Sequence, residues 1–136
     1  MNAPSITITR EVAAAIAAAA KNASPEECCG LVGGSNGVVT HAYSLRNESP
    51  RPETRYFASP EDLLGAMRAI REAGQTLMGI YHSHPRTSAY PSASDVEMAF
   101  YPEAVYFIMS LGTCSELRAF KINGDGVQEV DISIQG

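Results

Sequence analysis

The chain has 136 residues, of which 45% are hydrophobic and 18% are charged, and it carries a formal net charge of -5 with a pI near 5.1. This length and apolar content predict one compact domain over residues 1–136 with a hydrophobic core. The 10 lysines and arginines do not cluster, so the acidic balance argues against a nucleic-acid-binding surface. No apolar run reaches the roughly 18 residues of a membrane span, so no membrane partner is expected.

The three cysteines, Cys28, Cys29 and Cys114, are odd in number, and two of them are adjacent. Adjacent cysteines rarely bridge each other, and no C-x-x-C spacing of a zinc knuckle or a redox site occurs. We expect reduced thiols that behave as small core hydrophobes in a cytoplasmic protein. The sequence does not decide whether any of the three has a redox role.

The first elements are predicted from hydrophobic periodicity. The alternation in 5–9 predicts a strand, and the good helix formers of 11–22 predict a helix. The alanine-rich stretch 12–20 also invites comparison with the apolar core of a signal peptide. Glu11 interrupts the basic flank that a signal peptide needs, and a strand precedes the stretch. An opening strand and helix is therefore the simpler interpretation.

A hairpin and a loop are expected next. The short apolar stretch 28–32 ends at two glycines, and a second strand is expected over 37–43, past a turn at Ser35-Asn36. The polar segment 46–55, with its two prolines, is predicted to be a loop. Tyr56-Phe57 is predicted to form a brief strand.

The second half predicts two helices among four strands. Ser59-Pro60-Glu61-Asp62 is typical of a helix start, and Gly74 supplies its end. The short helix expected over 94–101 separates a strand over 76–84 from later strands, which are predicted over 105–111, 117–122 and 127–134, the last two joined by a turn at 123–126. This order predicts an α+β fold, a mixed β-sheet sandwiched by helices.

The most informative stretch is His82-Ser83-His84, which is followed by Asp95 eleven residues after the second histidine. If 76–84 is a strand, side chains at i and i+2 share one face, so both imidazoles can meet one ion. Two nitrogens and a carboxylate oxygen suit zinc, and three protein ligands leave a fourth position open for catalysis.

Each of these residues also has a structural interpretation. The two histidines can be hydrogen-bonded surface imidazoles, and Ser92-x-x-Asp95 fits a helix capping box. Glu27 lies three residues after Ser24 and fits a helix start as well. Taken together, however, Glu27 and Ser92 complete the set that zinc-dependent amide hydrolysis needs, a base and a donor for the developing oxyanion.

The pattern resembles a known family. Glu27-x-x-Gly30, then His82-x-His84-Pro85, Ser92 and Asp95 look like the JAMM motif of the MPN-plus metallopeptidases, the JAB-domain proteins. The likeness covers about residues 5 to 134 and implies a cytidine-deaminase-like architecture. Because there is little room for linkage-selecting insertions, the chain looks like the minimal prokaryotic type.

This resemblance implies a zinc-dependent peptidase or isopeptidase. Zinc would be held by His82, His84 and Asp95. Glu27 would take a proton from the attacking water and return it to the leaving amine, and Ser92 would stabilise the tetrahedral intermediate. The substrate would be the C-terminal tail of a ubiquitin-fold sulfur-carrier protein, or its conjugate, bound as an extended strand.

Several alternatives remain at this point. A catalytically silent MPN scaffold would lack part of the zinc set, which is complete here, and a general zinc metallopeptidase would cut other peptides. The amidohydrolases need a barrel of about 250 residues, and a DNA-repair role is disfavoured by the acidic balance. The sequence does not identify the substrate, distinguish processing from deconjugation, or determine the oligomeric state.

Overall fold

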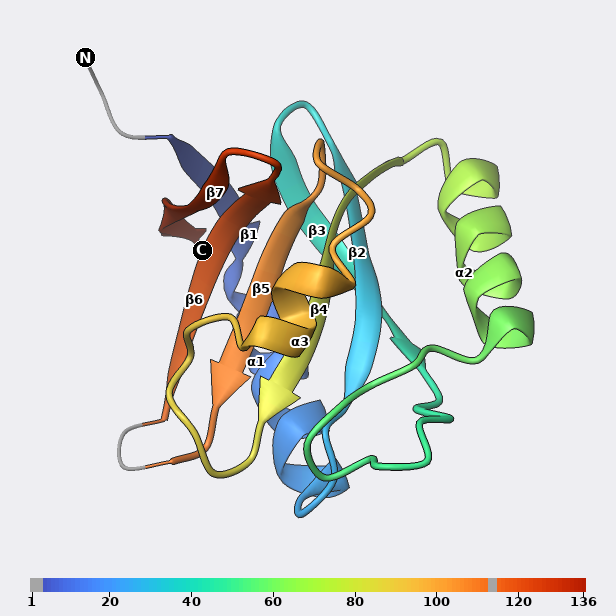
Figure 1. Ribbon diagram of the computed structural model, residues 1–136. Helices are drawn as coiled ribbons and strands as arrows, with labels where there is room; N and C mark the ends of the chain where they lie inside the picture. The colour runs from blue at the N-terminus through green and yellow to red at the C-terminus, as the bar shows by residue number, and fades with distance from the viewer. Residues whose placement is uncertain (1–3, 113–114) are drawn as a thin grey trace.

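The helices and strands follow one another in the predicted order (Figure 1). The computed structural model describes residues 4–112 and 115–136. Within these ranges the elements are, in chain order, β1 (Ser5–Thr9), α1 (Arg10–Ala23), β2 (Cys29–Ser35), β3 (Val38–Leu45), α2 (Pro60–Glu72), β4 (Thr76–His84), α3 (Ala93–Glu97), β5 (Val105–Ser110), β6 (Glu116–Asn123) and β7 (Gly126–Gln135). None of the helices in these ranges is long and apolar enough to span a bilayer.

The first hairpin turns later than the sequence predicted. Strand β2 does not end at Gly33-Gly34 but continues to Ser35, with an irregularity in its pairing to β3 between the two glycines. The turn is made by Asn36 and Gly37, whose φ angles are 55° and 78°. Two successive residues with positive φ are what a tight two-residue hairpin requires, and Asn-Gly meets that requirement best.

Two further predictions were wrong in their extent. The expected strand at Tyr56-Phe57 is absent from the described residues, where only an isolated bridge joins Asn47 to Ala58. The helix expected over 94–101 ends at Glu97. Beyond it the amides of Ala99 and Phe100 donate to the carbonyls of Val96 and Met98 (3.3 and 3.0 Å) and not four residues back, and the Tyr101 amide donates to the Tyr106 hydroxyl (3.1 Å).

The sheet is mixed, as predicted, and its pairing order closes on itself. Strand β1 pairs in parallel with both β3 and β7, which gives the circular order β1-β3-β2-β4-β5-β6-β7. Strand β4 lies between an antiparallel neighbour, β2, and a parallel neighbour, β5. Strand β4 is therefore an interior strand with hydrogen-bonded partners on both sides.

Helix α1 covers one face of the sheet. Thr9 caps it by accepting from the Val12 amide (3.2 Å), and Val12, Ile16 and Ala20 recur at a spacing of four residues, so they form one buried stripe. The stripe packs against strand residues that include Phe107 and Tyr81. The alanine-rich stretch is thus part of the main core, as the simpler interpretation predicted.

Helices α2 and α3 cover the opposite face (Figure 1). Ala66 and Ile70 of α2 pack with Cys29 and Leu31 of β2. A separate cluster lies under the α3 side, and it contains Ala89, Ala104, Tyr106, Ile108, Phe120 and Ile122. The sheet is therefore sandwiched by helices, which confirms the predicted α+β class. Near the end of β4, the side chains of the even-numbered residues lie on the face that α2 and α3 cover.

Candidate metal centre

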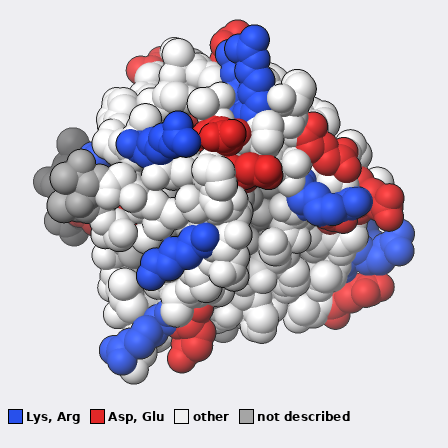
Figure 2. All heavy atoms as spheres, turned by 90° about the horizontal axis from the view of Figure 1, so that it is seen from below, with Lys and Arg blue, Asp and Glu red and all other residues white. Residues whose placement is uncertain are grey.

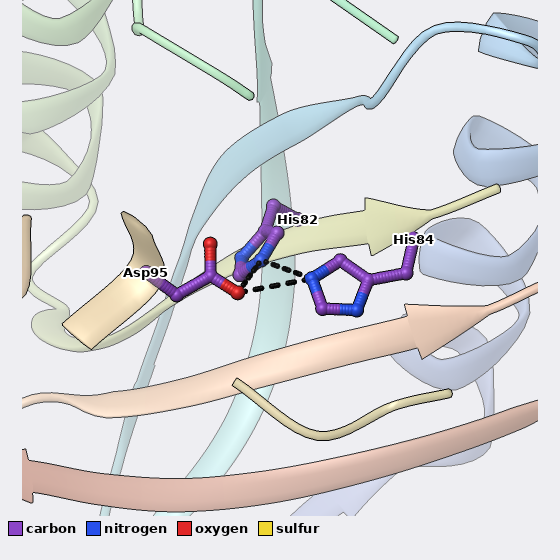
Figure 3. A group of neighbouring side chains, drawn as sticks. All are labelled: His82, His84 and Asp95. Atoms are coloured by element: carbon purple, nitrogen blue, oxygen red, sulfur yellow. Dashed lines mark hydrogen bonds and ion pairs between the residues drawn. The ribbon is translucent and has the colours of Figure 1, made fainter. Parts of the chain in front are cut away.

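The two histidines of β4 meet the carboxylate of α3 in a buried cluster (Figure 3). Asp95 Oδ2 lies 2.9 Å from His84 Nε2 and 3.1 Å from His82 Nε2, and the two Nε2 atoms are 3.2 Å apart. All three residues are buried, so the interpretation of the histidines as surface imidazoles was wrong. Two strand residues on one face and one helix residue therefore converge on a single point.

The start of α3 places Asp95. The Ser92 Oγ accepts from the Asp95 amide (3.1 Å), and the Ser92 amide donates to Asp95 Oδ2 (2.9 Å), which is a reciprocal capping box. The structural interpretation of Ser92-x-x-Asp95 is thus confirmed, but it does not exclude a chemical role. The same carboxylate faces the histidines, and a serine hydroxyl that accepts one bond keeps its own proton to donate.

Sheet register brings Glu27 to the cluster although it lies 55 residues before His82. Cys29 pairs with His82 across β2 and β4, and the Ser83 amide donates to the Cys28 carbonyl (3.1 Å). The next residue outward is Glu27, which lies close enough to His84 and Asp95 for their charges to affect its pKa. The Glu27 amide donates to the Pro52 carbonyl (2.7 Å), and no helix begins there, so its interpretation as a helix start was wrong.

The surroundings of Glu27 and Asp95 separate these two carboxyl groups electrostatically. Burial raises the pKa of Glu27 to about 8, although the charge of His84 opposes the shift and that of Asp95 adds to it. Burial alone would also raise the pKa of Asp95, but hydrogen bonds from His82 and His84 outweigh it and lower the pKa. Asp95 is therefore a stable anion, whereas Glu27 exchanges a proton near neutral pH.

The pKa values of the two histidines are also shifted in opposite directions by their surroundings. Burial lowers the pKa of His82, which favours its neutral form. For His84 burial also acts downward, but the hydrogen bonds to Asp95 and to the Ser88 carbonyl prevail and raise the pKa. Its Nδ1 lies 2.7 Å from the Ser88 oxygen and donates to it, so Nε2 is the atom turned toward the cluster.

Comparison with known proteins places the chain in a family. Residues 9–123 match the family described as prokaryotic homologs of the JAB domain. The chain therefore belongs to this JAB family. It is 34% identical to a desampylase of Haloferax volcanii over 82% of this chain and 80% of the relative, and 30% identical to a CysO-cysteine peptidase of Mycobacterium bovis over 95% and 90%. The solution structure of a Desulfitobacterium hafniense protein, 35% identical, superposes with a TM-score of 0.86 and covers 96% of this chain and 92% of that one.

The match confirms the family resemblance that the motif predicted. In this JAB-family chain the two histidines and Asp95 lie close together, and Ser92 and Glu27 adjoin them through the capping box and the strand register. Sequence reasoning missed Ser88, which orients His84, and it missed the position of Tyr56. The Tyr56 ring stacks on His82 with ring centroids 4.5 Å apart and an angle of 24°. Nothing in the spacing of the motif indicates either contact.

An apolar groove lies beside the cluster on the α2 and α3 face. Its cavity measures about 230 Å³. Its walls come from β2, β4, α2 and the segments before α2 and after α3, among them Cys29, Tyr56, Phe57, Leu63, Met67, Ile80, Met98, Phe100 and Tyr101. From the loop after β3, residues 46–56, only Tyr56 lines this groove. The other wall residues lie on strands β2 to β5, on α2, directly after Tyr56, or in the segment after α3.

The described cysteines are buried and unbridged. Burial raises the pKa of Cys29 to about 12 and raises that of Cys28 as well, so both remain thiols at neutral pH. The Cys28 amide donates to Ser83 Oγ (2.8 Å), which makes this residue part of the scaffold around the histidines. Cys114 lies outside the described residues.

The charged side chains on one face of the molecule are mixed in sign. Figure 2 shows lysines and arginines interspersed with aspartates and glutamates, around a centre that carries little charge. No extended basic surface is visible on this face among the described residues.

Proposed function

We propose that this chain is a zinc-dependent peptidase or isopeptidase that hydrolyses an amide bond at the C-terminal tail of a ubiquitin-fold, sulfur-carrier-like protein. The observation that carries the proposal is the buried convergence of His82, His84 and Asp95 beside a carboxyl group, Glu27, whose pKa is raised to about 8. The names of the two relatives, desampylase and CysO-cysteine peptidase, describe proteins that cleave, and we extend that activity to this chain.

The donor set fits zinc. Ligand atoms at about 2.0 to 2.1 Å from a tetrahedral ion lie about 3.3 Å from one another. The three donor atoms are 2.9 to 3.2 Å apart without an ion, so only small movements are needed. Two imidazoles and one carboxylate leave the fourth position open, which suits a catalytic site. Zinc bound there would polarise the substrate carbonyl and make water a stronger acid.

Glu27 is proposed as the general base and acid. At neutral pH its carboxyl is close to the point where it gains and loses a proton, which is the range in which proton transfer is most effective. A cation bound by the triad of His82, His84 and Asp95 would favour the carboxylate form of Glu27. Glu27 would take a proton from the attacking water and pass it to the nitrogen of the leaving amine as the amide bond breaks.

Ser92 is proposed as the oxyanion donor. Its Oγ already accepts from the Asp95 amide, so its hydroxyl orientation is restricted and the proton can point away from α3. A fixed donor stabilises charge that appears only in the transition state. The capping box and the oxyanion role are therefore compatible in one side chain.

The apolar groove is proposed as the binding place of the substrate tail. An extended tail can lie along it toward the triad, and the ring of Tyr56 beside His82 narrows the approach. A narrow approach favours residues without side chains next to the cleaved bond, as in a Gly-Gly end.

The expected cytoplasmic location and the single-domain organisation remain predictions.

The test combines metal content with cleavage. Purified wild type, loaded with zinc and dialysed, should hold near one equivalent, and His82→Ala should hold far less. Mass spectrometry should detect chelator-sensitive cleavage after the second glycine of ubiquitin-fold carriers with C-terminal extensions. Intact carriers together with hydrolysed unrelated peptides would indicate a general metallopeptidase, and no hydrolysis at all by zinc-loaded protein would indicate a silent scaffold.

A further inference from the structure

The loop between β3 and α2 is bound to the backbone of Glu27 on both sides. The Glu27 amide donates to the Pro52 carbonyl (2.7 Å), and the Glu27 carbonyl accepts from Asn47 Nδ2 (3.0 Å). Glu27 itself precedes β2. Its two backbone bonds go to the loop between β3 and α2 and not to a neighbouring strand. The position of this residue therefore depends on the loop as well as on strand register.

Asn47 also fixes the part of the loop that carries Tyr56. Its Nδ2 donates to the Arg55 carbonyl (3.0 Å), and its Oδ1 accepts from the Phe57 amide (2.9 Å). These are the residues on either side of Tyr56, whose ring stacks on His82. One amide side chain thus connects Glu27 with the residue that packs on His82.

This connection matters because Glu27 and His82 each have one polar side-chain atom that makes no hydrogen bond. Glu27 Oε1 and His82 Nδ1 are both buried and lack a hydrogen-bond partner among the described residues. At these two atoms the side chains are held only by backbone geometry and packing, although His82 Nε2 keeps its contact with Asp95 (3.1 Å). For Glu27 the backbone is held by Asn47 and Pro52, and for His82 the packing includes Tyr56.

We propose that Asn47 is a positioning residue for the proposed peptidase: through the Glu27 carbonyl it holds the general base, and through the backbone on either side of Tyr56 it holds the ring that packs on His82. This inference rests on the proposed function for its catalytic consequence. The effect on zinc binding does not need a substrate and can be measured separately.

A purely structural role for Asn47 predicts a different result, and Asn47→Asp separates the two. Aspartate keeps an oxygen that can accept from the Phe57 amide, so part of the loop bonding remains, but it cannot donate to the Glu27 carbonyl or to the Arg55 carbonyl. If Asn47 positions the base, Asn47→Asp and Asn47→Ala should both lose about tenfold to a hundredfold in kcat at saturating zinc, with little change in KM. If its role is only to stabilise the loop, the loss should follow the drop in unfolding midpoint and be smaller for Asn47→Asp.

Ser49→Ala is the matched control. Ser49 Oγ accepts from the Arg51 amide (3.1 Å) in the same loop, but its side chain makes no bond to Glu27 among the described residues. This variant should keep the kcat of wild type. A loss as large as that of Asn47→Asp would show that any disturbance of the loop suffices, which would overturn the specific role of Asn47.

Zinc affinity, measured by competition with a chromophoric chelator, gives a readout without turnover. Tyr56→Leu should weaken binding about tenfold, as loss of a supporting contact to a metal ligand does, whereas Tyr56→Phe should keep the ring and the affinity. Asn47→Ala should also weaken binding, and the effects of Asn47→Ala and Tyr56→Leu should not add in the double variant. Additive effects, or wild-type affinity in both single variants, would overturn the proposal.

The two hypotheses fail in different ways. Wild type that binds zinc but cleaves no substrate would contradict the proposed function, while the zinc-affinity comparison would still test Asn47. Wild type that cleaves, together with Asn47 variants of unchanged kcat, would contradict the positioning role alone. If Asn47→Ala does not fold, Asn47→Asp and the two Tyr56 variants carry the test.

Discussion

Tyr81 and His82 are neighbours on β4, are both almost fully buried, and face opposite environments. Tyr81 points toward α1 and packs in the main apolar cluster. His82 points toward the α2 and α3 side, where it meets His84, Asp95 and an aromatic ring. Burial stabilises the first face, because apolar surface leaves water there. On the second face the same burial leaves polar atoms without partners, which lowers stability and prepares the site for chemistry.

The sharpest way to test this contrast is to neutralise Glu27. Glu27→Gln keeps the shape of the side chain but cannot take a proton, so turnover should fall nearly to background. Zinc should remain near one equivalent per chain, because Glu27 is not among the three converging donors. Metal analysis and peptidase assays on the same preparation measure both. Cleavage at the wild-type rate would remove Glu27 from the mechanism.

A change on the α1 face should have the opposite profile. Phe107 is fully buried among α1 and its neighbours, so Phe107→Ala should lower the free energy of unfolding by about 3 to 5 kcal/mol. Denaturant unfolding measures the loss. At a temperature where the variant is still folded, kcat per zinc-loaded chain should remain near that of wild type. A large fall in kcat without a fall in stability would contradict the division between the two faces.

Ser92→Ala tests a residue that caps α3 and is also proposed to donate to the oxyanion. Removing one oxyanion donor should lower kcat about a hundredfold to a thousandfold, while the lost cap should lower stability by about 0.5 to 2 kcal/mol. Thr9→Ala is the matched control, since Thr9 caps α1 far from the triad. It should lose similar stability and keep its kcat. Equal kcat losses in the two variants would reduce Ser92 to a capping residue.

The smallest effect concerns pH and the metal-free protein. The pKa of Glu27 rises from 4.5 to about 8 on folding, so the folded state binds this proton more tightly than the unfolded chain. The resulting stability is complete below about pH 4.5 and is lost as pH rises toward about 8. Glu27→Gln does not ionise, so its urea midpoint relative to wild type should increase between pH 5 and pH 8.5. A constant difference would mean that Glu27 is not desolvated in the fold.

Sequence reasoning succeeded where the signal is local. Alternation and capping residues placed most strands and α2, since neighbouring side chains decide these patterns. It erred at Gly33-Gly34 and at Tyr56-Phe57, where the outcome depends on a turn and on a side-chain bond from Asn47. The end of α3 was also misplaced, because the amides after Met98 leave the helical pattern and that of Tyr101 binds a hydroxyl from β5.

The sequence by itself determined the family motif, which is a pattern of residue types and spacings. It also determined the shared face of His82 and His84 and the capping box that carries Asp95, because each of these depends on residues a few positions apart. Only the tertiary structure decided that β1 closes the sheet, that Glu27 lies near His84 and Asp95, and that the Tyr56 ring of a loop stacks on His82. These arrangements join segments tens of residues apart. Their energies come from strand pairing and burial in the assembled fold, which no local pattern records.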